Sequence, residues 1–157
     1  DCLNPNSYNL TLDNKLRVYT KPVLDPRKDN PTNEIPIPEE GILLQPGTLY
    51  LGQTVEYTET HERIVPMVEG RSSWGRLGLS IHVTAGFGDI GYCGTWTLEL
   101  GALHPLMLYP NMEICQIFYH YASHSEEGYS GRYQGARDII PSRLGLRDQR
   151  PSIRPRQ

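Results

Sequence analysis

Short runs in which apolar and polar residues alternate dominate the chain. Residues 7–12, Ser-Tyr-Asn-Leu-Thr-Leu, alternate in this way, and residues 16–19 follow after an Asp-Asn turn. Alternation with a period of two is typical of strands that bury one face. A single short helix is predicted, beginning near Ser72, because no long stretch has a helical period. Further strands are expected at residues 42–44, 48–57, 64–68, 79–84, 94–100, 106–109 and 114–121.

Turn-forming residues separate these runs. The 15 glycines and 13 prolines are spread along the whole chain, which is typical of many short strands joined by turns. Residues 22–41 hold five prolines and many charges, and we interpret them as a long surface excursion. The pattern predicts an all-β fold with few short helices, in a single domain over residues 1–146.

Charge and cysteine usage narrow the function class. The 15 basic and 18 acidic residues give a net charge of -3, whereas proteins that bind nucleic acid nonspecifically usually carry a positive excess. No apolar run approaches the roughly 18–20 residues that span a bilayer. The three cysteines are odd in number and far apart, so we expect no disulfide scaffold and a cytoplasmic location. Residues 147–157 carry four arginines and one aspartate, which we interpret as a mobile basic tail.

Two apparent motifs are rejected because of their surroundings. Residues 86–91, Gly-Phe-Gly-Asp-Ile-Gly, match the dinucleotide-binding pattern G-x-G-x-x-G, but that pattern must open a helix. An alternating, β-rich stretch follows instead, so we expect a tight turn where backbone approaches closely. His124-Ser125-Glu126 matches half of the zinc-deaminase signature, but no cysteine lies after Cys115 to complete it. We therefore expect no zinc site.

Two further segments carry candidate chemistry. Residues 70–76, Gly-Arg-Ser-Ser-Trp-Gly-Arg, place two guanidinium groups and two hydroxyls close together. If Ser72 opens a helical turn, its N–H groups point at an incoming anion, and Ser72 and Arg76 share one face. A capped surface turn explains the segment equally well. Glu99 is a lone carboxylate on the polar face of an alternating strand, which fits either a functional group or an exposed charge.

These segments together resemble the dCTP deaminase branch of the dUTPase-like family. The resemblance covers nearly the whole chain, in order and at matching intervals. It runs through residues 4–10, 69–79, 84–92, 97–100, 109–117, 129–135 and 141–143. Asn9, Ile90, Asn111 and Arg132 stand where other residues are usual. Members of the family start earlier in their sequence, so we expect that an N-terminal segment is missing here.

The resemblance implies a fold, an assembly and a reaction. The implied fold is a distorted jelly roll or β-barrel of the dUTPase-like type, assembled as a homotrimer whose sites are shared between subunits. The implied reaction is the zinc-independent hydrolysis of the 4-amino group of dCTP, which gives dUTP and ammonia. The resemblance further implies that Mg²⁺ is bound through the substrate phosphates and that dTTP inhibits the enzyme.

The resemblance also gives roles to individual residues. Glu99 is the implied catalytic carboxylate that takes a proton from the attacking water. Ser72 and Arg76 are implied to orient this water and to stabilise the developing charge. The backbone at Thr84 and Ala85 is implied to read the pyrimidine edge. The implied deoxyribose contacts are Asp89 and Tyr92, and the implied triphosphate contacts are Arg71, Ser73, Tyr129, Arg132 and Gln134.

Two alternatives stay open. In plain dUTPases a motif like residues 86–94 supplies an aspartate that activates water for attack on phosphate, and Asp89 matches it. The first alternative is therefore a bifunctional enzyme that turns dCTP into dUMP and pyrophosphate. The turn of such bifunctional enzymes resembles residues 85–89, which favours dUMP as the product. In contrast, the branched Ile90 stiffens the backbone beside the aspartate, which favours dUTP as the product. The second alternative is a noncatalytic β-barrel protein that binds nucleotides. We rank release of dUTP first, because the groups for deamination are complete.

Overall fold

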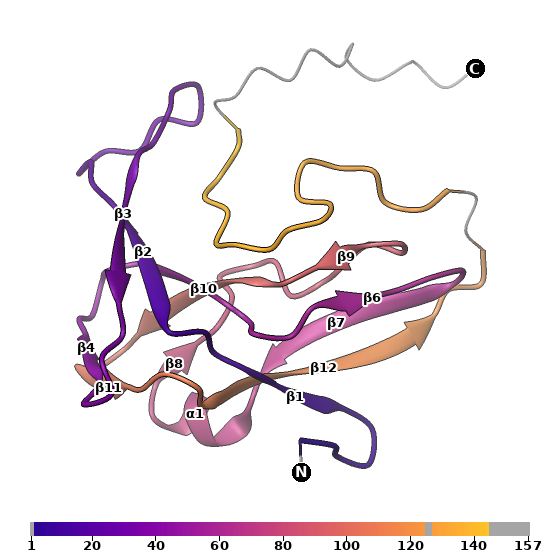
Figure 1. The fold of residues 1–157 in the computed structure, drawn as a ribbon, viewed down its shortest axis with the longest axis horizontal. Coiled ribbons are helices and arrows are strands. Elements are labelled where there is room, and N and C mark those ends of the chain that lie inside the picture. The colour runs from indigo at the N-terminus through magenta and orange to yellow at the C-terminus, as the bar shows by residue number, and fades with distance from the viewer. Residues whose placement is uncertain (1, 125–126, 145–157) are drawn as a thin grey trace.

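Short strands and one helical turn make up the structure, a computed structural model that describes residues 2–124 and 127–144 (Figure 1). Within these residues the strands are β1 (Tyr8–Thr11), β2 (Lys15–Tyr19), β3 (Thr32–Pro36), β4 (Ile42–Leu44), β5 (Tyr50–Gln53), β6 (Thr58–Glu59), β7 (Ile64–Gly70), β8 (Leu79–Ser80), β9 (Cys93–Gly94), β10 (Thr97–Ala102), β11 (Leu106–Leu108) and β12 (Glu113–Tyr121). The helix is α1 (Ser72–Arg76). The all-β prediction is confirmed. The basic tail predicted at 147–157 lies outside the described residues.

The strands form antiparallel sheets around a shared core. One sheet has the order β3-β2-β5-β10-β8 and a second the order β1-β12-β7, while β4 pairs with β11 and β6 with β9. The first strand of the chain pairs with the last, since Tyr8 lies opposite Ile117. Figure 1 shows β1 beside β12 across the lower part of the molecule. Two sheets closed over one core correspond to the predicted jelly roll or barrel. In the part of the chain described here, no helix has the length and apolarity needed to cross a membrane.

The core lies where the alternating pattern puts it. Along β10, Leu98, Leu100 and Ala102 are buried, while Thr97, Glu99 and Gly101, which alternate with them, are partly exposed. Neighbouring strands bury the same kind of face, and the fully buried side chains include Leu12, Leu16, Leu44, Val68, Leu108, Ile114 and Ile117. The strand predicted at residues 94–100 is thus confirmed in orientation, but β10 begins later, at Thr97, and extends to Ala102, while Gly94 belongs to β9.

The prediction for residues 22–41 is wrong in part. Thr32–Pro36 forms β3, which pairs along the whole length of β2, with Ile35 opposite Leu16. Prolines at both ends of this segment argued against a strand. However, β3 is the edge strand of its sheet, and an edge strand tolerates proline because one of its sides needs no ladder hydrogen bonds. The loops on either side of β3 remain as expected.

The turn before β12 explains one departure from the family pattern. Asn111 has a φ of 60°, in the left-handed region that glycine favours and that asparagine tolerates better than most residues. Its N–H donates to the carbonyl of Leu12 over 3.0 Å. Asparagine therefore fills the position that glycine usually takes in this turn, and the predicted turn is confirmed.

The glycine-rich segment lies against β7 instead of opening a helix. The carbonyl of Gly86 accepts the Val68 N–H over 2.8 Å, and the Gly88 N–H donates to the carbonyl of Pro66 over 2.9 Å. A Cβ atom on Gly88 would lie 2.4 Å from Cη2 of Trp96. Glycine is required here because the backbone lies close to both β7 and the indole ring of Trp96. The close approach expected from the sequence is confirmed.

We expect Gly88→Ala to lower the free energy of unfolding by about 1–3 kcal/mol, because the added methyl overlaps Trp96 and Pro66. Gly75→Ala is the matched control, since a Cβ there has nothing within 4 Å and the residue lies in α1. Alanine at this helical position is expected to be neutral or to stabilise by about 0.4–1 kcal/mol. Urea denaturation of both variants measures the difference, and a Gly88→Ala variant as stable as wild type would contradict the prediction.

Candidate active site

A cavity of about 620 Å³ lies against the polar face of β10. Its lining comes from β2, β5 and β10, from residues 83–92 and 129–142, and from Leu24, Leu49 and Trp96. Most of the lining side chains are apolar or aromatic, and its two carboxylates belong to Asp89 and Glu99. Among the described residues, no lysine or arginine lines it. This composition suits a flat, uncharged ring better than a polyanion.

Glu99 is held at this cavity by both its backbone and its side chain. It is half-buried on β10 opposite Leu51, and its N–H donates to the carbonyl of Ile81 over 2.8 Å. One carboxylate oxygen, Oε2, accepts the backbone N–H of Val83 over 2.8 Å. The strand predicted over residues 79–84 ends early at Ser80, since the chain bends here to meet Glu99. The carboxylate therefore lies in a cavity wall, which favours a functional group over an exposed charge on a solvated sheet face.

His82 lies near the carboxylate of Glu99 and does not itself line the cavity. Burial lowers the pKa of its imidazole, and the nearby charges of Glu99 and Glu69 oppose that shift. Neither ring nitrogen has a hydrogen-bond partner among the residues that the structure describes. The lowered pKa favours the neutral imidazole, so His82 does not neutralise the charge of Glu99. Nothing in the sequence indicated that His82 would lie near Glu99, apart from its position in the bend after β8.

Tyr92 lines the cavity and packs against the rings of Trp96 and Tyr129, a cluster that we call the aromatic floor. Its ring centroid lies 5.1 Å from that of Trp96 and 5.8 Å from that of Tyr129. The phenol donates to the carbonyl of Thr95 over 2.7 Å, and burial raises the pKa of Tyr92 to about 12. The phenol is therefore protonated and fixed at neutral pH. Such a rigid floor suits the predicted contact with a sugar.

Asp89 stands exposed at the rim of the same cavity. Its carbonyl accepts the Tyr92 N–H over 3.2 Å, which closes the turn between the glycine-rich segment and the aromatic floor. Thr84 and Ala85 also line the cavity. The cavity thus brings together six of the predicted site residues, namely Thr84, Ala85, Asp89, Tyr92, Glu99 and Tyr129.

The residues of α1 are not brought to this cavity within one chain. The helix begins at Ser72 as predicted, and Nη1 of Arg76 donates to Oγ of Ser72 over 3.4 Å. Ser72, Ser73 and Arg76 are exposed, and none of them lines the cavity that holds Glu99. The shared face predicted for Ser72 and Arg76 is confirmed, but it lies apart from the carboxylate with which it is expected to act.

Arg71, at the start of α1, is engaged by Glu113. Its Nη1 lies 2.7 Å from Oε2 of Glu113 and donates to the Glu113 carbonyl over 3.1 Å. Nδ2 of the buried Asn9 donates to the same Oε2 over 2.8 Å. An aspartate in place of Asn9 would put a second carboxylate against Glu113 and could not donate when ionised. The departure at Asn9 and the pairing of Arg71 therefore belong to one network.

Gln134 binds backbone groups of its own chain. Its Nε2 donates to the carbonyls of Gly91, over 2.7 Å, and Tyr129, over 3.2 Å. Its Oε1 accepts the N–H of Cys93 over 2.9 Å. In this arrangement Gln134 fixes the turn beside Tyr92, and a contact with phosphate requires it to exchange these partners. Arg132, like Gln134, does not line the cavity.

Sequence reasoning missed the outer walls of the cavity. Tyr19, Tyr133, Ile140 and Ser142 line it together with Thr97. Tyr19 and Ile140 belong to no motif, whereas Tyr133 and Ser142 lie in segments that resemble the family but were given no role. Thr97 carried a further signal, because alternation puts it on the same face of β10 as Glu99.

Comparisons with known proteins agree with the family resemblance of the sequence. A family model described as dCTP deaminase-like matches residues 1–122. A protein of Hathewaya histolytica named "dCTP deaminase, dUMP-forming" is 59% identical over 143 residues, which make up 90% of this chain and 83% of the relative. A protein of Cytophaga hutchinsonii with the same name is also 59% identical over 143 residues, or 82% of its length.

A solved structure shows the fold. The 2'-deoxycytidine 5'-triphosphate deaminase from Agrobacterium tumefaciens superposes with a TM-score of 0.62 at 22% identity. The match covers 78% of this chain and 41% of the solved one. The family model spans the strands and the glycine-rich turn that build the cavity, and the relatives match nearly the whole chain. On these grounds the chain belongs to the dCTP deaminase-like family.

Proposed function

We propose that this chain hydrolyses dCTP to dUMP, pyrophosphate and ammonia. The observation that carries the proposal is that Glu99 and Asp89 line one cavity in a chain 59% identical to proteins named for this reaction. From the sequence we expected dUTP as the final product. The names of the relatives support the dUMP-forming alternative better, and Asp89 supplies a carboxylate for the second step.

The first step is the hydrolysis of the C4–N4 bond of cytosine. Glu99 takes a proton from water as the water oxygen attacks C4, and passes it to N3. The second water proton reaches the amino group, the C4–N4 bond breaks, and ammonia leaves. Since Oε2 accepts the N–H of Val83, Oε1 is the oxygen left to hold the water. That same contact sets the backbone of residues 83–85 beside the base, where it can read the pyrimidine edge.

The second step is the cleavage of the bond between the α-phosphorus and the bridging oxygen. Asp89 takes a proton from a second water, which attacks the α-phosphorus, and pyrophosphate leaves. The exposed position of Asp89 at the rim fits a substrate whose base points toward Glu99 and whose phosphates point outward. The triphosphate would bring Mg²⁺ with it, and the ion would neutralise part of the charge on the phosphate oxygens. Among residues 2–124 and 127–144, no three His, Cys, Asp or Glu side chains gather as metal ligands.

The triphosphate also needs cations that this cavity lacks. No lysine or arginine lines it among the described residues, while α1 presents Arg76 on an exposed surface elsewhere. A homotrimer with shared sites joins the two halves, because α1 of one subunit then faces the cavity of its neighbour. In this arrangement Ser72 and Arg76 act in a site together with the Glu99 of another subunit.

We expect two inactive variants to restore each other's activity in mixed trimers. Glu99→Gln disables the cavity half of a shared site, and Arg76→Ala disables the helix half. In trimers assembled at random from equal amounts, about a quarter of the interfaces combine two intact halves, so about a quarter of the wild-type activity should return. Refolding the variants together and measuring ammonia release tests this.

A matched control sets the baseline for the mixing experiment. Glu99→Gln mixed with Glu99→Ala has no intact cavity half, so no activity is expected to return. If the first mixture is as inactive as this control although mixed trimers have formed, the site is not shared.

The proposed function is tested by the products from dCTP. Purified protein is incubated with dCTP and Mg²⁺, and ammonia and pyrophosphate are measured over time. Equal rates of both products, with dUMP as the nucleotide, are expected. Ammonia with accumulating dUTP and no pyrophosphate would make the enzyme monofunctional, as we ranked first from the sequence. Binding of dCTP without either product would favour the noncatalytic alternative.

A further inference from the structure

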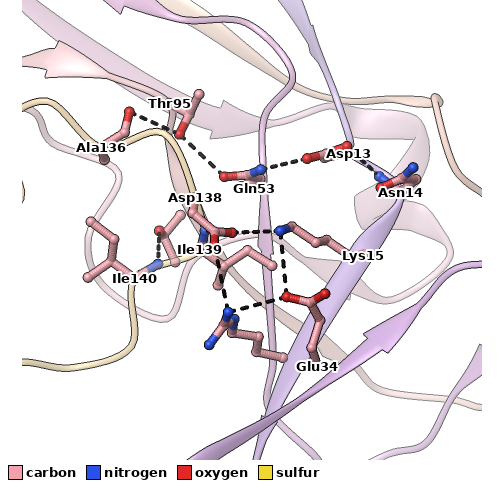
Figure 2. Close-up of polar contacts among 12 residues, drawn as sticks. Asp13, Asn14, Lys15, Glu34, Gln53, Thr95, Ala136, Asp138, Ile139 and Ile140 are labelled. Carbon is pink, nitrogen blue, oxygen red and sulfur yellow. Dashed lines mark hydrogen bonds and ion pairs between the residues drawn. The ribbon is translucent and has the colours of Figure 1, made fainter.

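Four charged side chains tie the C-terminal part of the described chain to β2 and β3 (Figure 2). Nζ of Lys15 lies 2.9 Å from Oδ1 of Asp138 and 3.5 Å from Oε2 of Glu34. Nη2 of Arg17 lies 3.2 Å from the same glutamate oxygen and 3.6 Å from Oδ2 of Asp138. Each charge therefore has two partners of opposite sign. We call these four residues the clasp.

Asp138 belongs to a segment, residues 134–142, that forms one wall of the cavity. We call this segment the strap. Ala136, Ile140 and Ser142 of the strap line the cavity. The Ile140 N–H donates to Oγ1 of Thr97 over 3.1 Å, and the Ser142 N–H donates to the phenol oxygen of Tyr19, also over 3.1 Å. Both acceptors line the cavity as well, so the strap fixes side chains on two other walls.

Side chains, more than strand pairing, hold the strap in place. Ladder pairing is limited to a bridge between Gly94 and Ala136, and the Thr95 N–H donates to the Ala136 carbonyl over 2.9 Å. Beyond this point Ile139 is buried, and the Ile139 N–H donates to Oδ1 of Asp138 over 2.7 Å. Asp138 thus orients the backbone that presents the Ile140 N–H to Thr97.

The carboxylate of Asp138 is ionised at neutral pH. The hydrogen bond from Lys15 holds the pKa of Asp138 below its usual range, with help from the Ile139 N–H and from Arg17, against the opposing effect of burial. The side chains of the clasp remain partly open to solvent, with Asp138 half-exposed. Pairs of this kind contribute little one by one and more as a network.

We propose that Asp138 is a positioning residue of the nucleotide site, which acts through Lys15 and Arg17 to hold the strap against Thr97 and Tyr19. The inference rests on the proposed function for its kinetic test, since it assigns the strap wall to substrate binding. Asp138 takes no part in the chemistry, and Glu99 keeps its own contacts with Ile81 and Val83. Loss of the clasp therefore weakens substrate binding while the chemical step continues.

The kinetic test uses Asp138→Asn, with Asp29→Asn as the matched control. The carboxylate of Asp29 is exposed, and it makes no ion pair among the described residues. Asp138→Asn is expected to raise KM for dCTP roughly three- to tenfold with kcat within about twofold of wild type. Asp138→Glu keeps the charge and should recover part of the loss. Asp29→Asn should match wild type in both constants.

A double-mutant cycle tests whether Asp138 acts through Lys15. Lys15→Met keeps the aliphatic stem and removes the charge, so it should raise KM in the same direction. If the two residues act as one unit, the variant with both Lys15→Met and Asp138→Asn raises KM in total by less than the product of the two single effects. Because partly exposed pairs are screened by salt, the gap between wild type and Asp138→Asn should shrink at high ionic strength.

Hydrogen exchange supplies a readout that does not depend on activity. The amides of Ile140 and Ser142 should exchange faster in Asp138→Asn than in wild type, while amides in β10 stay protected. An unchanged KM, or fully multiplicative effects in the cycle, would overturn the positioning role. If wild type releases no ammonia from dCTP, the proposed function fails by itself, and unchanged exchange in the strap would then overturn the inference independently.

Discussion

Glu99→Gln is expected to lower kcat for ammonia release from dCTP by about 10²–10⁴-fold, the usual effect of losing an essential acid–base group. The amide has the shape of the carboxylate but cannot take a proton from water near neutral pH. Its oxygen still accepts the N–H of Val83, which in wild type donates to Oε2 of Glu99. The bend after β8 should therefore survive the substitution, and with it the binding of dCTP.

Two measurements make this result specific. Affinity for dCTP, measured by calorimetry, should stay within a few-fold of wild type, which separates loss of chemistry from loss of binding. Glu40→Gln is the matched control, because Glu40 is exposed in the loop before β4, and its activity should be unchanged. Near-normal turnover by the Glu99 variant would remove this residue from the mechanism.

Asp89→Asn is expected to separate the two steps. Release of pyrophosphate should fall about 10²-fold or more, because no carboxylate remains at the rim to take a proton from the second water. Release of ammonia should continue, since Glu99 and its backbone contacts are untouched. The expected product is then dUTP in place of dUMP. Assays that follow ammonia, pyrophosphate and the nucleotide in one reaction measure all three.

The outcome for Asp89 also separates its two possible roles. The family resemblance gives this residue a contact with the deoxyribose, and loss of that contact alone would raise KM for both steps equally. An equal fall in ammonia and pyrophosphate would therefore contradict a specific role in phosphate cleavage. Asp29→Asn, with its exposed carboxylate, serves as the control and should form both products at wild-type rates.

The sequence carried much of the fold because its signals were local. Alternation located β10 and gave the face on which Glu99 lies, and the run of glycines indicated a tight approach to β7. Where local signals conflicted, the prediction failed. Residues 32–36 were not predicted to form β3 because prolines stand at both ends. The pattern does not reveal that this strand lies at the edge of its sheet, where proline is tolerated.

Only part of the site could be predicted, because the sequence shows local patterns and not which distant segments meet. Asp89 and Glu99 stood in recognisable segments, and the cavity holds both. The separation of Arg76 from that cavity depends on how the chain folds; the resemblance implied sites shared between subunits, but the motifs did not show which residues lie on which side. The clasp was not visible at all, since Lys15 and Asp138 lie far apart in the sequence and each looks like an ordinary surface charge.

The pairing of β1 with β12 also bears on how the protein is made. The partner of Tyr8 is Ile117, so at about 5–20 residues per second the ribosome needs roughly 5 to 20 s to deliver it. Until β12 has been made, β1 has no strand to pair with. The three-stranded sheet of β1, β12 and β7 therefore cannot form, and the barrel stays open on that side. Such non-local pairing is typical of slow folding, in the range of milliseconds to seconds after release. Nascent chains stalled before β12 should therefore expose β1 to protease, and protection should appear only once the whole of β12 has left the exit tunnel.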